Sequence, residues 1–536
     1  MNDSYRNNRL RRLLLLVHLL GAFACTAAAQ LSVLDLPDSA IAKAYEQAAT
    51  KNVLAAVNAK VFYGYWSVCA DGKGFGYGNT YPSLDGNQLS DALLWLGQAD
   101  VVKANWSYVR SFQRSDGLLP LAILPSLAGK MVGPEGVQSA VSSNGGLYKH
   151  WVPGNPLEAL ASITYIQNAD IIFRHTLDIQ WLRDQLPSVN LAASYLDSLT
   201  TISGAVRGGG FYLERPARIE SDGVTQCYAS EVLSRLSALN RIAGLNDDAK
   251  RCQALADRIR EHFVSGFWMS DHFAEYFNPA HGYVASHGLT DVDWAAVATG
   301  TISPSQVSLL WPRLRSEKGF LYGGMPTGIS TRPETYEPWE FTYADRYDLA
   351  AMGRVWYLEA WARARMGDAQ GLIDGLHRVC DEGRKNGYTW RERYQADSAG
   401  GVRGSGPNTY CEYPANLIRI VQEFLLGVDL RADGSIMLAP TVTDEFWRKG
   451  FGQTVQWTGR TLSYHMTFDR IEGTFFSASP FILGVRLPAH DGSASLQASI
   501  DGRSFVPKQE GDFIIVSLPL HDRDNPGTFE IVRKPN

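Results

Sequence analysis

Two glutamates stand among aromatic residues at the two ends of a glycine-rich stretch of this sequence. Glu392 lies between Trp390 and Tyr394. Glu412 directly precedes Tyr413. Cleavage of a glycosidic bond needs one carboxylic acid to protonate the leaving oxygen and one carboxylate to activate water or attack the sugar. Paired carboxyls beside aromatic rings therefore indicate a sugar-cleaving site.

Three further segments combine carboxyls with aromatic rings or glycines. In a sugar-binding pocket, such rings and additional carboxyls hold the substrate while two carboxyls transfer protons. The residues that stand out in these segments are Tyr81 and Asp85; Glu214, Glu220 and Asp222; and Tyr336, Trp339 and Glu340.

Each of these carboxyls also has a purely structural interpretation. Asp222 stands at the start of an expected helix and is able to cap it, and Glu412 lies in the first turn of another helix. Glu392 has an arginine on each side, and Glu340 has Arg346 nearby. Ion pairing alone would account for these two glutamates.

Apolar residues recur at helical spacing in twelve stretches of the chain. In one of them Val232, Leu236 and Leu239 share a face, and Gly244 ends the pattern. The sequence therefore predicts helices near 38–59, 88–97, 99–114, 156–174, 177–199, 224–243, 247–264, 290–299, 304–316, 343–367, 369–386 and 412–426.

The segments between these helices alternate in length. Those after the second, fourth, sixth, eighth and tenth helices are a few residues long, whereas the others have about 20 to 40 residues. This alternation describes six antiparallel hairpins, and a ring of hairpins puts every long loop at one end. An open solenoid would show a repeat of fixed period, which the sequence lacks. We therefore expect a mainly α protein, an (α/α)6 barrel with its function among the long loops.

The pattern changes near residue 430. Short β-rich runs such as "TLSYHMTF" and "DFIIVSL" follow, separated by Gly, Asp and Pro turns. The sequence therefore predicts a barrel domain over 30–430 and an antiparallel, sandwich-like β-domain over 431–536. The tail has no cluster of carboxyls and aromatic rings, so we expect no catalytic residue there.

Residues 1–29 have the pattern of a secretory signal. Several arginines precede an apolar run at 13–24 that is too short to span a bilayer, and Ala27 and Ala29 stand where a signal peptidase reads. Lipid attachment at Cys25 is the less favoured alternative, because the residues before it make a poor lipobox. We expect an exported protein, periplasmic or secreted, without a membrane span.

The net charge of the chain limits which classes of partner it is expected to bind. The leader holds four arginines and one aspartate, so its removal changes the net charge from −5 to −8. A chain this acidic is not expected to bind nucleic acid or an anionic membrane. An oligo- or polysaccharide or another glycoside remains as the expected partner, and the sequence leaves the oligomeric state open.

Neither a metal nor another cofactor is predicted. Five cysteines remain after the leader, an odd number at wide spacings without a CxxC pair, so a zinc site is not expected. Buried thiols and one or two disulfides are both open. His281 and His287, with Asp291 and Asp293, would be the candidate metal ligands, but they lack the spacing of ligands on a helix.

The order of these motifs resembles that of the six-hairpin (α/α)6-barrel glycosidases, over roughly residues 60 to 430. "YPSLDGNQLSDALLWLG" and "SDGLLP" are similar to a run in trehalases and related α-glucosidases, and "YGGMPTGIS" resembles their Gly-Gly-Ile-Pro-Thr-Ser segment. "RERY", a glycine-rich loop and "CEYP" resemble their Glu-Lys-Tyr and Gly-Gly-Gly-Glu-Tyr pair. "TWRERY" also resembles the Trp-Glu-Arg segment of α-L-rhamnosidases, and the β-rich tail is similar to theirs.

This resemblance implies a role for each candidate. Glu392 matches the catalytic base in both patterns. Asp222 falls where trehalases place their acid, although this chain reads "ESDGV" in place of "ESGWD". Asp85 matches a sugar-binding aspartate of trehalases and lies near the general acid of rhamnosidases, so Asp222 is the preferred acid and Asp85 the alternative. The expected substrate-binding residues are Asp85, Tyr81, Tyr336, Trp339, Glu340, Trp390 and Glu412.

The expected function is that of an exported glycoside hydrolase, inverting, exo-acting and independent of cofactors. Two alternatives remain. A polysaccharide lyase on the same toroid would need Tyr, His or Arg as proton shuttles and a cation-lined cleft. A non-catalytic carbohydrate-binding protein would need the loss of only one carboxyl.

Overall fold

The computed structural model describes residues 33–57, 66, 68–71, 84–120, 158–208, 218, 220–341, 346, 348–396, 400–457, 459–488 and 494–535. For Asp85 it describes the backbone alone. The leader with Cys25, the candidate binding residue Tyr81, and Glu214 lie outside the described residues.

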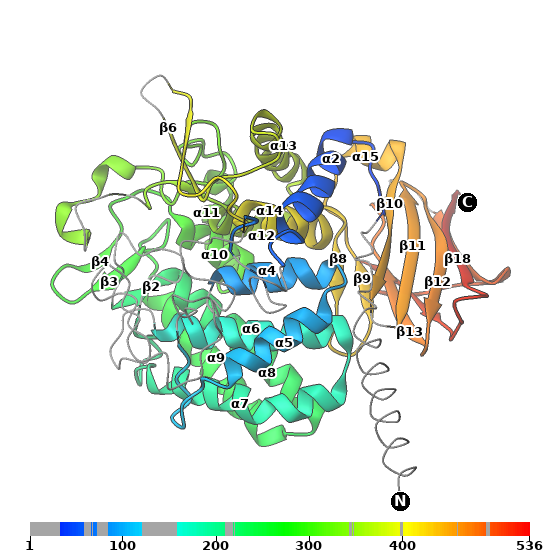
Figure 1. Ribbon diagram of the computed structural model, residues 1–536, viewed down its shortest axis with the longest axis horizontal. Helices are drawn as coiled ribbons and strands as arrows, with labels where there is room; N and C mark the ends of the chain where they lie inside the picture. The colour runs from blue at the N-terminus through cyan, green and yellow to red at the C-terminus, as the bar shows by residue number, and fades with distance from the viewer. Residues whose placement is uncertain are drawn as a thin grey trace, which may run out of the picture.

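Twelve helices of the described chain form two rings (Figure 1). The inner helices are α4 (Leu84–Trp95), α6 (Glu158–Thr176), α8 (Gly223–Ala243), α10 (Asp291–Thr299), α12 (Gly353–Arg365) and α14 (Glu412–Arg419). The outer helices are α2 (Ser39–Gln47), α5 (Ala99–Arg110), α7 (Ile179–Ser198), α9 (Asn246–Gly266), α11 (Pro304–Leu314) and α13 (Ala369–Lys385).

The inner helices contact one another in a closed cycle. α4 packs on α6, and the contacts continue through α8, α10 and α12 to α14, which returns to α4. At the closing contact Asn416 donates to Gln88, and Arg419 Nε donates to Asp91 Oδ2 at 2.8 Å. The ring confirms the six-hairpin barrel expected from the loop lengths.

Burial separates the two rings. Every side chain of α14 is buried, because an inner helix is covered on all sides. Outer helix α13 buries one stripe that includes Leu372, Leu376 and Val379 and exposes its opposite face. Gly244 and Gly300 end α8 and α10 with φ of 86° and 74°, in the left-handed region that favours glycine.

Three helices differ from their expected form. α12 begins at Gly353 rather than near residue 343, because Ala351–Met352 form strand β5 and pair with β6 instead of opening the helix. Helices α2 and α14 continue as π-helices η1 (Ala48–Val53) and η6 (Ile420–Leu425).

The described parts of the long loops lie at the end of the barrel where the inner helices begin. They form small sheets, β2 (Ser221–Asp222) with β3 (Tyr276–Asn278) and β4 (Gly282–Val284), and β5 with β6 (Arg393–Ala396) and β7 (Val402–Ser405). Two short 3₁₀ turns, η4 (Pro333–Thr335) and η5 (Pro338–Glu340), complete them. Backbone pairing joins five of the loops: Ser221 with Phe277, Thr290 with Ser330, Ala351 with Tyr394, and Cys69 with Tyr410. The described loops therefore share one end, as expected.

The C-terminal strands form two sheets at the opposite end (Figure 1). Strand pairing is antiparallel throughout them except between β9 and β13. The first sheet runs β1 (Val33–Asp35), β10 (Phe451–Trp457), β11 (Arg460–Thr467), β12 (Arg470–Ser477), β18 (Gly527–Pro535), β14 (Ala494–Ile500), β15 (Arg503–Phe505). The second runs β16 (Lys508–Glu510), β17 (Phe513–Leu518), β13 (Phe481–Val485), β9 (Ile436–Leu438), β8 (Val428–Leu430), and a short helix α15 (Asp444–Lys449) precedes β10.

Two strands of these sheets come from chain before residue 431. β1 pairs with β10, and β8 pairs with β9. The β-domain therefore draws on both sides of the barrel sequence. Among the described helices, none is both long enough and apolar enough to cross a bilayer. Cys227, Cys252 and Cys380 are buried free thiols.

Candidate active site

Glu392 and Glu412 come together on one arginine at the long-loop end. Glu392 directly precedes β6, and Glu412 is the first residue of α14. Arg354, the second residue of α12, places Nη2 2.6 Å from Glu412 Oε2 and 3.9 Å from Glu392 Oε1. Its backbone N–H also donates to Glu412 Oε1 at 2.5 Å. Both glutamates are buried, so the arrangement brings together two carboxylates that the sequence separates by a glycine-rich loop.

A second arginine completes this cluster. Arg393 is ion-paired with Glu392, and its Nη2 lies 2.6 Å from Asp348 Oδ1. Of the two arginines that flank Glu392, Arg391 instead donates to the carbonyl of Gly406 at 2.8 Å. Nearby cations favour the ionised form of a carboxyl. Glu392 is thus held between Arg354 and Arg393.

Two buried aromatic residues, Trp390 and Tyr394, fix the backbone that flanks Glu392. Trp390 is fully buried and donates its indole N–H to the carbonyl of Val379 on α13 at 3.1 Å. Tyr394 is also buried, and its hydroxyl accepts the backbone N–H of Arg391 at 2.9 Å. The two rings fix the backbone on both sides of the glutamate.

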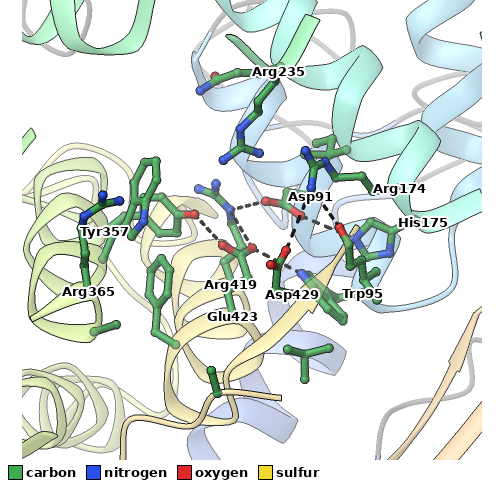
Figure 2. A pocket seen from close by; sticks show the side chains of 18 of the residues that line it. Asp91, Trp95, Arg174, His175, Arg235, Tyr357, Arg365, Arg419, Glu423 and Asp429 are labelled. Atoms are coloured by element: carbon green, nitrogen blue, oxygen red, sulfur yellow. Dashed lines mark hydrogen bonds and ion pairs between the residues drawn. The ribbon is translucent and has the colours of Figure 1, made fainter. Parts of the chain in front are cut away.

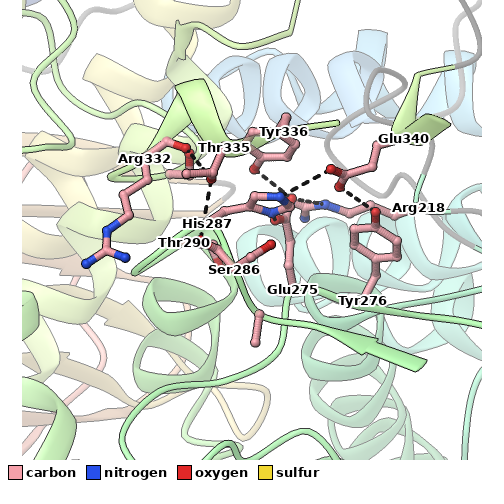
Figure 3. A network of polar contacts seen from close by, with 12 residues as sticks. Arg218, Glu275, Tyr276, Ser286, His287, Thr290, Arg332, Thr335, Tyr336 and Glu340 are labelled. Atoms are coloured by element: carbon pink, nitrogen blue, oxygen red, sulfur yellow. Dashed lines mark hydrogen bonds and ion pairs between the residues drawn. The ribbon is translucent and has the colours of Figure 1, made fainter. Parts of the chain in front are cut away.

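A second buried cluster joins the third, fourth and fifth long loops around Arg218 (Figure 3). The guanidinium donates to Glu275 Oε1 at 2.8 Å, to Asp222 Oδ1 at 2.9 Å and to Asp291 Oδ1 at 2.7 Å. All four side chains are buried. One cation thus serves three carboxyls, two of which stand at the starts of inner helices α8 and α10.

Asp222 caps helix α8. Its Oδ2 accepts the backbone N–H and the hydroxyl of Thr225, each at 2.9 Å, while Oδ1 accepts from Arg218. The residue is 0% exposed. These contacts match the structural interpretation of Asp222 as a helix N-cap.

His287 links this cluster to the fifth loop. Its Nδ1 contacts Glu275, and its Nε2 lies 3.3 Å from Glu340 Oε1. Its ring stacks on Tyr336 with centroids 3.6 Å apart and planes at 9°. Burial alone would lower the pKa of His287, but the hydrogen bonds to Glu275 and Glu340 raise it to about 9. The imidazole is therefore protonated at neutral pH.

Asp291 is the carboxyl of this cluster that titrates nearest to neutrality. Burial raises its pKa to about 7, with Arg218 opposing the rise and Glu275 and Asp222 adding to it. A buried carboxyl with such a pKa can carry a proton at neutral pH. Both oxygens of Asp291 accept hydrogen bonds from Arg218. Protonation of Asp291 is therefore coupled to the contacts of Arg218 with the other carboxyls.

Two of the expected binding residues of the fifth loop are buried, and one is exposed. Glu340 accepts the hydroxyl of Tyr276 at 2.6 Å, and the Tyr336 hydroxyl donates to Glu275 at 2.8 Å. Trp339 is 43% exposed and stacks on His281, with centroids 3.7 Å apart. Trp339 is the residue of the three that presents a ring to solvent. Arg346 lies over the ring of Phe341, at 5.3 Å from its centroid.

Sequence interpretation missed the residues that hold the clusters together. Arg218 and Arg354 donate hydrogen bonds to the carboxylates of the two clusters, and these carboxylates lie up to 73 residues away in the chain. Glu275 had a local signal that was available, because it is a lone carboxyl within the apolar run "FAEYF". A charge in such a run requires a buried partner.

Two of the four residues named as candidate metal ligands have other partners. Asp293 forms the capping box of α10 with Thr290, and His281 stacks on Trp339. Within the described stretches of the chain, no group of three or more His, Cys, Asp or Glu side chains is placed to hold a metal ion.

Comparison with known proteins identifies the fold. No family model matches the sequence, and no curated protein is similar to it. The α-L-rhamnosidase of Dictyoglumus thermophilum aligns over 94% of this chain and 50% of its own, with 11% identity and a TM-score of 0.59. The GH78 rhamnosidase of Bacillus sp. GL1 aligns over 86% and 43%, with 14% identity and a TM-score of 0.61.

A third match is the Streptomyces avermitilis α-L-rhamnosidase solved with L-rhamnose. It aligns over 94% of this chain and 42% of its own, with 14% identity and a TM-score of 0.56. This chain thus spans half or less of the length of these proteins. At such low identities the likeness shows the fold, a six-hairpin toroid followed by β-sheets, as the sequence motifs indicated.

Proposed function

We propose that this chain is a glycoside hydrolase whose active site lies among the long loops, with Glu392 as the catalytic base. The observation that carries this proposal is the placement of Glu392 and Glu412 on Arg354 at the end where the inner helices begin. In the reaction, Glu392 takes a proton from water as the water attacks the anomeric carbon. The acid gives its proton to the glycosidic oxygen as that bond breaks.

For the acid we favour Asp85 over Asp222. Both oxygens of Asp222 already accept hydrogen bonds, from Arg218 and Thr225, and the side chain is fully buried. Asp85 is the second residue of α4, an inner helix that begins at the same end as α14. A separation of about 6.5–9.5 Å between the acid and the base would give inversion, and about 5–5.5 Å would give retention. We propose inversion.

The other expected substrate-binding residues fall into two groups, exposed ones that can contact a sugar and buried ones that support the site. Trp339 offers an exposed ring on which a sugar can stack, and we propose Tyr81 as a further contact. Glu412, through Arg354, and Trp390, through the backbone, hold Glu392 in place. We propose that Tyr336 and Glu340 support the opposite wall through His287. Long loops around the site favour a closed pocket and exo action, and the leader pattern favours export.

The substrate class follows from the matched structures and the motifs. Three α-L-rhamnosidases share the fold, so an aryl α-L-rhamnoside is the first substrate to try. An aryl α-glucoside is the second, because several motifs resemble those of trehalases. In either case we expect a single sugar to be released from the non-reducing end.

The test is a panel of aryl glycosides and mixed glycans, with new reducing ends and ultraviolet absorbance measured in parallel. We expect new reducing ends without an ultraviolet-absorbing product, and the anomer formed first reports inversion or retention. Ultraviolet absorbance would identify a lyase. Glycan binding without any turnover would identify the non-catalytic alternative, and either result would overturn the proposal.

Two matched variants decide the acid. Asp222→Asn keeps an N-cap, since asparagine caps a helix as well as aspartate does, but it cannot donate a carboxylic proton. Asp85→Asn makes the same change at the other candidate. We expect a loss of about 10²-fold or more in kcat for Asp85→Asn and a much smaller loss for Asp222→Asn. The reverse order would assign the acid to Asp222.

A further inference from the structure

A cavity of about 450 Å³ lies inside the barrel, and its wall extends from Asn87, in the first turn of α4, to the last turns of α6 and α12 (Figure 2). Its walls come from α4, α6, α8, α12 and α14 with η6, and its floor comes from β8 and neighbouring residues of the C-terminal sheets. Glu412 begins α14, whereas the wall residue Glu423 lies eleven positions later, roughly 15 Å along a helix. Neither Glu392 nor Glu412 lines it, and the wall residue nearest in sequence to the proposed acid Asp85 is Asn87, two positions after it on α4.

Arginines dominate the charge of the cavity wall. Arg174 and Arg235 share the buried Asp170, at 2.7 and 3.1 Å, and Arg419 pairs with Asp91 at 2.8 Å.

Two further wall arginines, Arg365 and Arg486, have no carboxylate within ion-pair distance in the part of the chain that the structure describes. Arg486 donates to the carbonyl of Ala439 at 3.4 Å, and partial desolvation, followed by the charge of Arg260, lowers the pKa of Arg365. Arg365 is exposed and Arg486 is half-buried, and these two cations at the cavity wall, which no described carboxylate pairs with, favour an anionic occupant.

Glu423 does not neutralise these arginines. Burial and then the charge of Asp91 raise its pKa to about 8, so that it is mostly protonated at neutral pH. The Tyr357 hydroxyl bonds to its Oε2 at 2.5 Å, the Trp95 indole donates to its Oε1 at 3.4 Å, and Arg419 lies 3.9 Å away. The other carboxyls of the wall are Asp91, which pairs with Arg419, and the exposed Asp429, 4.0 Å from Arg174.

The wall also holds a buried nitrogen without a hydrogen-bond partner. His175 is 8% exposed, and among the described residues its Nδ1 has no partner. Its Nε2 faces Asp91 at 3.9 Å, and its ring lies edge-on to Trp95. A buried polar atom of this kind calls for an occupant of the cavity. Stacked rings of Trp361 and Phe424, 6.4 Å apart at 12°, line the same space.

We propose that this cavity is a second ligand site, which binds a small carboxylate-bearing ring molecule of the class of the sugar acids. The carboxylate pairs with Arg365 and Arg486, the only charges of the described wall without a partner of opposite sign. The ring lies against Trp361 and within reach of His175 Nδ1 and the protonated Glu423, which satisfy its hydroxyls. The cavity volume is within the range of small-molecule sites.

The experiment is calorimetric titration of the full chain with D-glucuronate, D-glucose and inorganic phosphate at pH 7. We expect glucuronate to bind at least about ten-fold more tightly than either of the other two, because only it offers both a ring and a carboxylate. If glucose binds as tightly as glucuronate, the arginines do not recognise a carboxylate. If only phosphate binds, the site recognises an anion and not a ring. Either result, or no binding of glucuronate, overturns the proposal.

Variants place the ligand in this cavity rather than in the active site. Arg365→Gln combined with Arg486→Gln should weaken glucuronate binding by about ten-fold or more, since a charge-assisted hydrogen bond contributes about 1.5–3 kcal/mol. The corresponding double lysine variant, which keeps the charge, should recover part of the affinity. Arg384→Gln on outer helix α13 is the matched control and should bind as the native chain does.

Two further measurements test where glucuronate binds and whether Glu423 contributes to its affinity. Glu392→Gln should leave the glucuronate affinity unchanged, which separates this site from the proposed active site. Affinity should fall above pH 8 in the native chain, as Glu423 becomes charged, and should not fall in Glu423→Gln. Melting curves without ligand report whether each variant is folded. Unchanged affinity in the folded double glutamine variant would overturn the proposal.

Discussion

The two ends of the inner helices differ in the charged residues of their terminal turns. Where the inner helices begin, acidic residues cap or open α8, α10 and α14; where they end, arginines stand in the last turns of α6, α8 and α12. The helix dipole favours this distribution at both ends, whatever the function of the protein. A carboxyl at a helix start is therefore weak support for catalysis. Glu392 differs because it lies outside any helix, before a strand, and is held by side chains.

The largest expected effect separates Glu392 from the acidic residues that merely complement a dipole. Glu392→Gln keeps the shape but cannot accept a proton, so kcat should fall by about 10²–10⁴-fold with little change in KM. Steady-state kinetics on the best aryl glycoside measure this. Glu445→Gln, on exposed helix α15 beyond the opposite end, is the control. Normal turnover in Glu392→Gln would show that Glu392, too, is only structural.

The second prediction concerns Arg218, which holds three carboxyls at the long-loop end. Arg218→Met leaves Glu275, Asp222 and Asp291 buried without their cation, which should cost about 3–5 kcal/mol of unfolding free energy. Urea unfolding followed by fluorescence checks it.

The control for this prediction is an exposed ion pair, Arg258 with Asp197 at 2.7 Å. Arg258→Met should cost about 1 kcal/mol or less, because solvent screens the pair. Equal costs for the two variants would mean that the buried network contributes nothing beyond an ordinary surface pair.

The third prediction is a pH dependence of stability. The pKa of His287 is about 9 in the folded chain and 6.5 in the unfolded one, so its contribution is complete below pH 6.5 and is lost as the pH rises towards 9. The loss should be about 2–3 kcal/mol over that window. Melting temperatures measured from pH 6 to 9 should fall less in His287→Gln than in the native chain. His465→Gln, at a half-buried histidine of the C-terminal sheets, is the control variant.

The smallest effect is expected at the exposed rim. Trp339→Ala should raise KM by about two- to ten-fold, since an aromatic contact contributes about 0.5–1.5 kcal/mol, and should leave kcat nearly unchanged. The melting temperature should not move, because the ring is 43% exposed. A fall in stability instead would mean that Trp339 supports His281 and the loop rather than the substrate.

Sequence patterns predicted the barrel well because its determinants are local. Loop length, helical spacing and end residues such as Gly244 are read within a few positions, and all twelve helices appear where they were expected. The start of α12 was wrong by ten residues because a strand pairing with β6, far away in the chain, decides it. Tertiary contacts override local propensity at such a boundary.

The site was less predictable for the same reason. Glu392 and Glu412 could be selected by their neighbours, but the arginine that unites them, Arg354, lies 58 residues from Glu412 and has no local motif. The cap function of Asp222 was visible in the sequence, whereas its pairing with Arg218 within a network of three carboxyls was not. Residue type indicates what a side chain can do, and only the fold decides which partner it meets.

The closure of the inner ring has a consequence for how the chain reaches its folded state. The contact that shuts the ring joins α4 to α14 across 328 positions, and Gln422 Nε2 reaches the Tyr45 hydroxyl across 377, at 2.9 Å. During synthesis the first five hairpins therefore form an arc whose two apolar flanks stay exposed until the sixth emerges. Such an arc is prone to aggregate and invites a chaperone. We expect nascent chains that stop before α14 to be captured rather than to fold.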